Sequence, residues 1–394
     1  MLTTHTRTMA SERKGQFPER TDSARQNRLA ELLDEIPVID VDVHVSFFAE
    51  ELQRDIADRL DDPYAQQLEY YLNDGSSYGY SGWANDTWDR DLMGKAPTTL
   101  AEVTDPHEDI MDILSEEFHI DHPIIDPLPE LNTVQQTDKA IAYMRATNDM
   151  LIDRFLDECE DMYGLLTLIP HDPEACAAEI DRLGDEDQIV GAFWNSTGVK
   201  TPLGDPENDV IYRAAEKKGL PMVYHGAAAP GVEVDFPILQ YEMNTYFGNH
   251  ALTHIFSQFM NLTSLFENGV PAKFPDLDFV FKEAGVAWGT LMYRLNREYK
   301  ERKPEIPHLQ KTPEEYFRDQ FYIGTQPLDE PNDDRHIKSI LDMLGAESLM
   351  FATDYPHFDV DSTESFIQLL SDFSEDEREQ ILYKNAAEVY GIDV

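Results

Sequence analysis

Four apolar segments of this chain end in side chains that bind metal ions or transfer protons. Asp42 and His44 stand two residues apart at the end of one segment, and His225, Glu283 and Asp354 close three others. Side chains of a β-strand alternate between its two faces, so Asp42 and His44 are expected to point the same way. Two imidazoles and two carboxylates that converge suit a borderline divalent cation such as zinc or manganese.

Each of these residues has a plainer interpretation when it is taken alone. A single histidine at a strand end is more often a hydrogen-bonded structural residue than a metal ligand, and one Asp-X-His pair is a weak signal. Polar side chains in a protein interior are costly to bury unless they are paired or bind a metal. The joint pattern therefore predicts a metal site at the ends of these strands.

The elements that must position these residues are short apolar runs separated by helical patterns. The runs are mostly continuous rather than alternating, as expected for parallel strands that are covered on both faces. Helix signals stand between them; for example, Asp172-Pro173 begins a helix that ends at Gly184. The eight runs span residues 38–45, 122–127, 163–170, 189–195, 221–226, 278–285, 321–327 and 349–356.

This alternation predicts a (β/α)8 TIM barrel, in which active-site groups lie at the carboxyl ends of the strands. A doubly wound open sheet is the alternative, but no glycine-rich phosphate-binding turn follows the first run.

Residues 1–30 carry six basic and three acidic residues without apolar periodicity, and we expect a mobile N-terminal segment. Residues 31–394 would form the barrel domain. The long connection 46–118 would be an inserted lid or subdomain between the first and second strands.

Aromatic and basic residues near the predicted barrel mouth are candidates for substrate binding. Trp194 and Asn195 end the fourth run and are expected to face the pocket, and Trp83 would reach it from the lid. Such walls suit a planar or apolar part of a substrate, although buried aromatics are more often simple core. Arg90 is the lid's candidate for binding a carboxylate, unless a neighbouring aspartate already pairs with it.

The charge of the chain restricts its partners and its environment. Asp and Glu number 77 against 31 Lys and Arg, which gives a formal net charge of -46. Such self-repulsion destabilises a compact protein unless salt screens it, so the composition is typical of a halophile. Nucleic acids and anionic membranes are poor partners for this surface. No apolar run of 18 residues and no signal peptide is visible, so a cytoplasmic location is expected.

Several segments together resemble a known enzyme family. Val38–His44, Pro221–His225, Thr353–His357, Phe274–Tyr299 and Asn385–Gly391 are similar to the corresponding segments of the amidohydrolase-related group of TIM-barrel metal-dependent hydrolases, which includes aminocarboxymuconate-semialdehyde decarboxylase. The resemblance covers about residues 36 to 394, and the insertion at 46–118 matches least.

The resemblance implies one divalent metal ion, usually zinc and sometimes manganese. Asp42 and His44 would be its ligands from the first strand, His225 from the fifth and Asp354 from the eighth. Asp354 would also accept a proton from water that the metal activates. His357, three residues after Asp354, would be a proton shuttle or support the site, although a solvent-exposed loop histidine is an equally good interpretation.

One residue departs from the family pattern. The decarboxylase and its near relatives carry a histidine at the end of the sixth strand, where this chain has Glu283, which cannot act as a cationic donor. His254, Glu242 and His357 are candidate substitutes. His250 and His254 have a spacing that can bind metal on one helix face, but no acid adjoins them in sequence, which favours packing or substrate contact.

These observations favour a metal-dependent hydrolase that acts on a small molecule, with Asp354, Glu283, His357 and His254 as the catalytic candidates. The alternative is non-oxidative decarboxylation of a small aromatic or unsaturated carboxylic acid at the same metal. A barrel that binds a ligand without turnover is a third hypothesis. The resemblance also suggests a homodimer.

Overall fold

Eight parallel strands form the centre of the molecule. The computed structural model describes residues 36–46, 49–74, 103–128, 134, 136–169, 172–195, 201–226, 246–357, 359–370 and 373–394. The strands pair in chain order from β1 to β8, and every pairing is parallel. Their bounds are β1 Ile39–Ser46, β2 His122–Leu128, β3 Tyr163–Thr167, β4 Ile189–Asn195, β5 Met222–His225, β6 Phe279–Lys282, β7 Phe321–Gly324 and β8 Leu349–Met350.

The chain that follows β8 closes the sheet against β1. The backbone N–H of Val41 donates to Phe351 O at 3.1 Å, and His44 N–H donates to Tyr355 O at 2.8 Å. Val43 and Tyr355 form a further parallel bridge. The predicted TIM barrel is therefore confirmed, and all eight predicted runs contain a strand.

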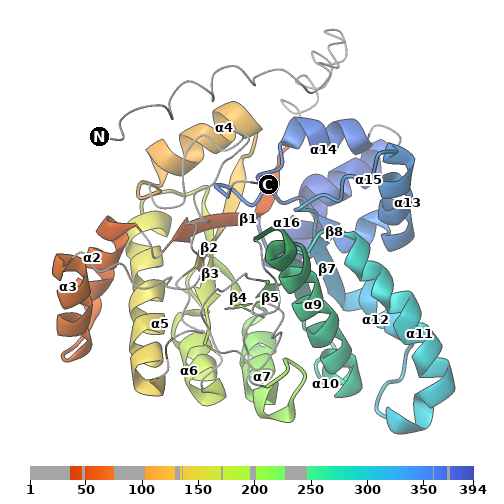
Figure 1. Cartoon of the computed structure of the whole chain (residues 1–394), viewed down its shortest axis with the longest axis horizontal. Coiled ribbons are helices and arrows are strands. Elements are labelled where there is room, and N and C mark those ends of the chain that lie inside the picture. Colours follow the sequence, from red (N-terminus) through yellow and green to blue (C-terminus); the bar gives the residue numbers. More distant parts are fainter. Residues whose placement is uncertain are drawn as a thin grey trace, which may run out of the picture.

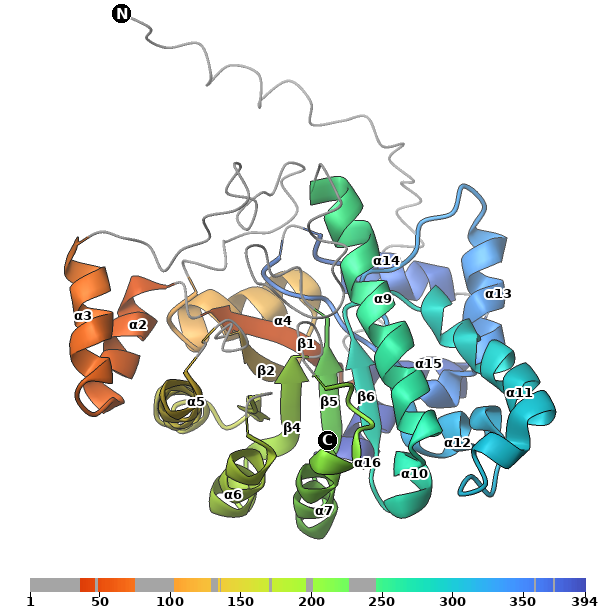
Figure 2. The ribbon, with the colours of Figure 1, turned by 60° about the horizontal axis from the view of Figure 1, so that its bottom comes forward.

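Helices surround the barrel, as Figures 1 and 2 show. The predicted helix start at Asp172 is confirmed, because its side chain accepts from Ala175 N–H at 3.0 Å, and Thr312 and Ser374 form capping boxes at two further helices. The helices are α2 Glu50–Arg59, α3 Tyr64–Asp74, α4 Asp112–Phe118, α5 Thr137–Leu151, α6 Pro173–Leu183, α7 Asp209–Lys218, α9 Tyr246–Glu267, α10 Val270–Lys273, α11 Leu291–Arg302, α12 Pro313–Gln320, α13 Asp334–Leu344, α14 Thr363–Leu369, α15 Glu375–Glu379 and α16 Asn385–Tyr390.

Two apolar layers hold these elements together. The larger one fills the space between strands and helices. The smaller one lies inside the barrel, where Ile39, Leu165 and Val280 meet Val389 and Ile392 from the C-terminal segment. The barrel interior is thus packed below the carboxyl end of its strands, where Asp42, His44, His225 and Asp354 gather.

The insertion between β1 and β2 is described in two parts. Helices α2 and α3 lie at the flank of the barrel beside α5 (Figures 1 and 2). Near its end, Asp109 O accepts a hydrogen bond from the Tyr355 hydroxyl at 2.5 Å, which ties the insertion to the loop after β8. The lid stays a prediction, because Trp83 and Arg90 lie outside the described residues.

Among the helices described, none has the length and apolar character needed to span a lipid bilayer.

Candidate metal centre

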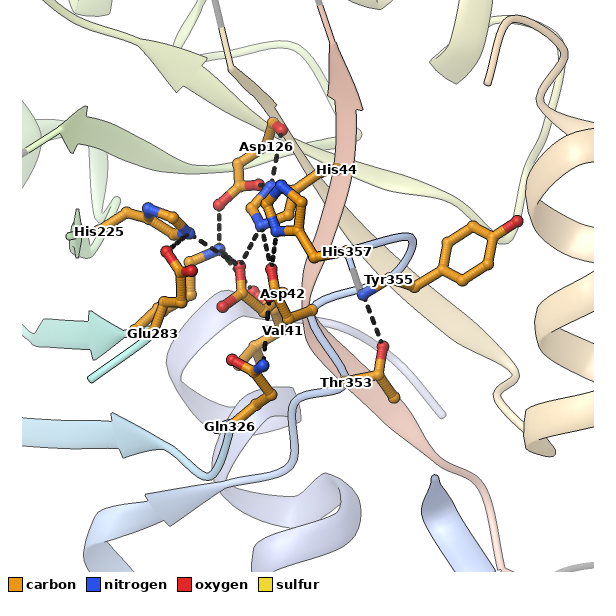
Figure 3. Close-up of polar contacts among 12 residues, drawn as sticks. Val41, Asp42, His44, Asp126, His225, Glu283, Gln326, Thr353, Tyr355 and His357 are labelled. Atoms are coloured by element: carbon orange, nitrogen blue, oxygen red, sulfur yellow. Dashed lines mark hydrogen bonds and ion pairs between the residues drawn. The ribbon is translucent and has the colours of Figure 1, made fainter. Parts of the chain in front are cut away.

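Four buried side chains converge at the carboxyl end of the barrel. Asp42, His44, His225 and Asp354 each present one ligand atom, and these four atoms lie within 4.8 Å of one another. The His44 Nε2 atom is 3.3 Å from Asp42 Oδ1 and 2.7 Å from Asp354 Oδ1. The His225 Nε2 atom is 3.7 Å from the same Asp42 oxygen. Figure 3 shows Asp42, His44 and His225 pointing toward a common centre.

An irregularity in β1 places its two ligands inside the barrel. Ile39 and Val41 belong to the interior layer, so strict alternation would turn Asp42 outward. The register of β1 against β2 shifts by one residue between Asp40 and Val43, which is a β-bulge. As a result Asp42 and His44 face inward, and Val43 packs in the outer layer.

The last ligand is held by the loop that continues β8 along β1. Asp354 donates its backbone N–H to Asp42 O at 2.9 Å and has a positive φ of 64°. Glu283, after β6, also has a positive φ of 49°. Non-glycine residues in this left-handed region are strained, and such strain is concentrated at functional sites.

The hydrogen bonding of His44 suits a metal ligand. Its Nδ1 contacts a carboxylate oxygen of Asp126, which leaves Nε2 directed at Asp42 and Asp354. Histidines that bind metals commonly donate their other ring N–H to a carboxylate in this way. The Asp42 Oδ2 atom is buried and accepts no hydrogen bond from any residue that the structure describes. These two nitrogen and two oxygen donors therefore fit a divalent cation.

Lys282 and Asp126 lie at the register of His225 and His44 and complete the surroundings of the site, and the sequence analysis did not single them out. The Lys282 ammonium contacts an Asp126 carboxylate oxygen, lies 2.9 Å from Asp42 Oδ1 and donates to Val41 O at 2.8 Å. All of these groups are fully buried. A charged residue in each of two mostly apolar strands, HPIIDPL and FVFK, was the signal that could have identified them.

The charges around His44 determine its protonation when no cation is bound. Burial alone would lower the pKa of His44, but the carboxylates of Asp126 and Asp42 raise it to about 10. Burial alone would raise the pKa of Asp126. The positive charges of His44 and Lys282 outweigh burial, so the pKa of Asp126 is lowered. A cation therefore competes with a proton for His44 Nε2.

Glu283 connects this site to a second group of histidines. Its Oε2 atom is 3.2 Å from His225 Nε2 and 3.2 Å from His254 Nε2. Burial raises the pKa of Glu283, but the His254 and His225 imidazoles bring it well below its ordinary value. Burial lowers the pKa of His254, and the Glu283 charge more than reverses this, so the pKa is raised.

Asp354 also contacts His357 and Gln326. The His357 Nδ1 atom is 2.6 Å from Asp354 Oδ1, and Gln326 Nε2 donates to Asp354 Oδ2 at 3.2 Å. Burial, followed by the negative charge of Glu283, raises the pKa of Asp354 well above its ordinary value. His357 is buried, in contrast to the solvent-exposed interpretation of this residue.

The fourth strand corrects one pocket prediction. Trp194 is buried in the outer layer between strands and helices, so its side chain does not face the barrel mouth. Its neighbour Phe193 lies inside the barrel, with its ring centroid 5.8 Å from that of His225. Two consecutive residues of a strand cannot both point inward, and the inward position falls on Phe193 and Asn195. Glu242 lies outside the described residues.

Comparison with known proteins agrees with this geometry. The model of the Amidohydrolase family matches residues 39–392. A gamma-resorcylate decarboxylase from Rhodococcus jostii (strain RHA1) is 23% identical over 303 residues, which cover 72% of this chain and 88% of that relative.

Solved structures share the fold. A 5-carboxyvanillate decarboxylase from Novosphingobium aromaticivorans, complexed with manganese and 4-hydroxy-3-methoxy-5-nitrobenzoic acid, superposes with a TM-score of 0.66 at 20% identity. The alignment covers 90% of this chain and 96% of that one. The 5-carboxyvanillate decarboxylase from Sphingomonas paucimobilis gives a TM-score of 0.67 at 20% identity, covering 91% and 100% of the two chains. The resemblance seen in the sequence motifs is confirmed, and the chain is an enzyme that belongs to the Amidohydrolase family.

Proposed function

We propose that this enzyme catalyses the non-oxidative decarboxylation of a small hydroxylated aromatic carboxylic acid. Asp42, His44, His225 and Asp354 would hold one divalent cation, manganese or zinc. When bound, this cation supplies positive charge that orients the oxygens of an anionic substrate. The proposal takes the alternative from the sequence analysis in preference to hydrolysis.

The observation that carries the proposal is the contact between Asp354 and His357. Loss of CO2 breaks a carbon–carbon bond and leaves an electron pair on the ring carbon, which must receive a proton. Asp354 is fully buried beside the other candidate ligands, and its Oδ1 atom is 2.6 Å from His357 Nδ1. A buried carboxyl paired with a histidine is placed to pass a proton to a ring carbon bound at this site. His357 would then return a proton to Asp354.

The relatives support the same reaction and suggest the substrate class. Four curated proteins that match this chain are named gamma-resorcylate decarboxylase. Structures with the same fold contain 2,6-dihydroxybenzoate or a nitrobenzoic acid. The Phe193 ring lies beside the ligand His225 and offers an apolar wall that suits a planar ring.

Release of CO2 from 2,6-dihydroxybenzoate and 5-carboxyvanillate tests this proposal. The manganese-loaded chain in molar KCl should release CO2, and Asp354→Asn should lower the rate by at least about a hundredfold, the usual contribution of a general acid. Metal content should persist, because the amide oxygen of the introduced asparagine can still bind the cation. Asp333→Asn, at an exposed helix cap, is the matched control and should keep the wild-type rate.

Two results would contradict the proposal. Cleavage of aryl esters or amides without any CO2 release would identify a hydrolase. Tight binding of the benzoates with no turnover in either assay would favour a ligand-binding barrel.

A further inference from the structure

A second group of metal-binding side chains lies next to the first. His250 and His254 are one turn apart on α9, and their ring centroids are 4.8 Å apart. No acid adjoins them in sequence, but the fold brings Glu283 from the end of β6 and Asp359 from the loop after β8. His250, His254 and Glu283 each present a ligand atom, and these atoms lie within 4.8 Å of one another.

The ligand atoms of these groups are spaced as they would be around one ion. The His254 Nε2 atom is 3.2 Å from Glu283 Oε2, and His250 Nε2 is 3.9 Å from Glu283 Oε1. The His250 Nε2 atom is also 4.0 Å from Asp359 Oδ2. Ligand atoms around 2.1 Å from one cation are separated by about 3–4 Å, which is the spacing seen here.

His254 is oriented as a metal-binding histidine. Its Nδ1 atom is 3.2 Å from the backbone carbonyl oxygen of His250, so Nδ1 carries the proton and Nε2 faces Glu283. The position is tightly determined, since a Cβ added at Gly226 would lie 2.8 Å from the His254 ring and 3.0 Å from its Cα. Only glycine lets α9 approach the end of β5 so closely; Figure 2 shows α9 running beside β5 and β6.

Asp359 has an oxygen without a partner. Its Oδ1 atom is buried and accepts no hydrogen bond from any described residue. The side chain as a whole is 20% exposed. A buried carboxylate oxygen without a hydrogen bond is costly, and a bound cation would remove that cost.

The charge of the buried cluster points the same way. Five carboxylates and one ammonium lie in and beside the two groups, so acidic side chains exceed the ammonium by four among these described residues, an excess that bound cations or protonated imidazoles would offset. The charged residues counted are Asp42, Asp126, Glu283, Asp354, Asp359 and Lys282.

We propose that His250, His254 and Glu283 bind a second divalent cation, with the Asp359 carboxylate beside His250. The Glu283 carboxylate lies between the two groups, because its Oε2 atom contacts His225 of the first group and His254 of the second at the same distance, 3.2 Å. Imidazoles combined with carboxylate select a borderline ion such as manganese or zinc over calcium or magnesium. Known two-metal sites hold their ions about 3.5–4 Å apart.

Metal counting tests the second site independently of the reaction catalysed. The full chain is stripped with a chelator in molar KCl, reconstituted with Mn²⁺ alone, freed of excess ion and analysed for manganese per chain. About two ions per chain are expected for the wild type and about one for His250→Gln/His254→Gln. His336→Gln, an exposed histidine on α13, is the matched control and should keep both ions.

A second measurement keeps the test decisive if the double variant does not fold. Two manganese ions at such a distance couple magnetically, so the wild-type electron paramagnetic resonance spectrum should show a coupled pair. One ion per wild-type chain with the spectrum of isolated manganese would overturn the proposal, and His254 and Glu283 would then be an ion pair that holds a proton instead. That result would leave the proposed decarboxylation intact, because it needs only the first site.

Discussion

Lys282 shows how a single residue can support a metal site without binding the metal. Its ammonium is fully buried between Asp42 and Asp126, so its side chain reaches from β6 to β1 and β2. Burial would lower the pKa of Lys282, but the charges of Asp126 and Asp42 raise it, so it remains a cation. The residue therefore neutralises carboxylates that would otherwise repel one another in the barrel interior.

Replacing this lysine should destabilise the fold. We expect Lys282→Met to lower the free energy of unfolding of the metal-free chain by about 3–5 kcal/mol, because it leaves buried carboxylates uncompensated. Urea unfolding in molar KCl measures this. Lys217→Met removes a surface ion pair with Asp181 and should leave the urea midpoint nearly unchanged. Equal midpoints for the two variants would show that Lys282 is not needed for charge balance.

At the scale of elements, β6 carries charge at both ends of an apolar core. Lys282 and Glu283 lie at its carboxyl end, in the metal centre, and Asp278 precedes its first residue. Burial, and then the charge of Glu388 on α16, raises the pKa of Asp278 from its ordinary 3.8 to about 6. The folded state therefore binds a proton here more tightly than the unfolded chain does.

This pKa shift predicts that Asp278→Asn stabilises the folded chain in a pH-dependent way. The stability that the protonated carboxyl contributes is present below pH 3.8 and is lost as the pH rises through about 6. Relative to the wild type, the free energy of unfolding of the variant should therefore increase across this pH window, by about 1–2 kcal/mol after allowance for partial exposure of Asp278. Urea midpoints at pH 4, 5, 6 and 7.5 report the difference. A difference that does not change with pH would refute the assignment of the shift to Asp278.

At the scale of the whole molecule, the net charge of -46 is the dominant property. Ion pairs between described surface residues, such as Arg318 with Glu347 at 2.6 Å, compensate only part of it, since acids outnumber bases 77 to 31. Screening shortens the Debye length from about 10 Å at 0.1 M salt to about 3 Å at 1 M. Stability should therefore depend on salt far more than for an ordinary enzyme.

We expect the melting temperature to rise by on the order of 10 °C between 0.1 M and molar KCl, because the repulsion is screened. Differential scanning calorimetry of the metal-loaded chain measures this. Sucrose at matched osmolality is the control for general exclusion effects and should have a much smaller influence. A melting temperature independent of KCl would argue against the halophilic interpretation.

The homodimer stays a prediction, and sedimentation in the same buffers would test it.

The amino-acid sequence by itself determined the barrel and the first metal group, because both depend on local patterns. Apolar runs and helix-end signals locate eight strands without knowledge of their neighbours. The carboxyl ends of parallel strands meet at one end of the barrel. The proximity of Asp42, His44, His225 and Asp354 could therefore be predicted from the sequence.

Only the tertiary structure decided what surrounds those ligands. The bulge in β1 sets which face Asp42 presents, and the phase of β4 turns Trp194 outward and Phe193 inward. Helix α9 brings His254 to Glu283, although the two residues are far apart in the chain and no sequence spacing relates them. Lys282 and Asp126 likewise meet across the barrel. Contacts between distant strands follow from barrel closure and side-chain length rather than from local periodicity, so the sequence pattern could not predict them.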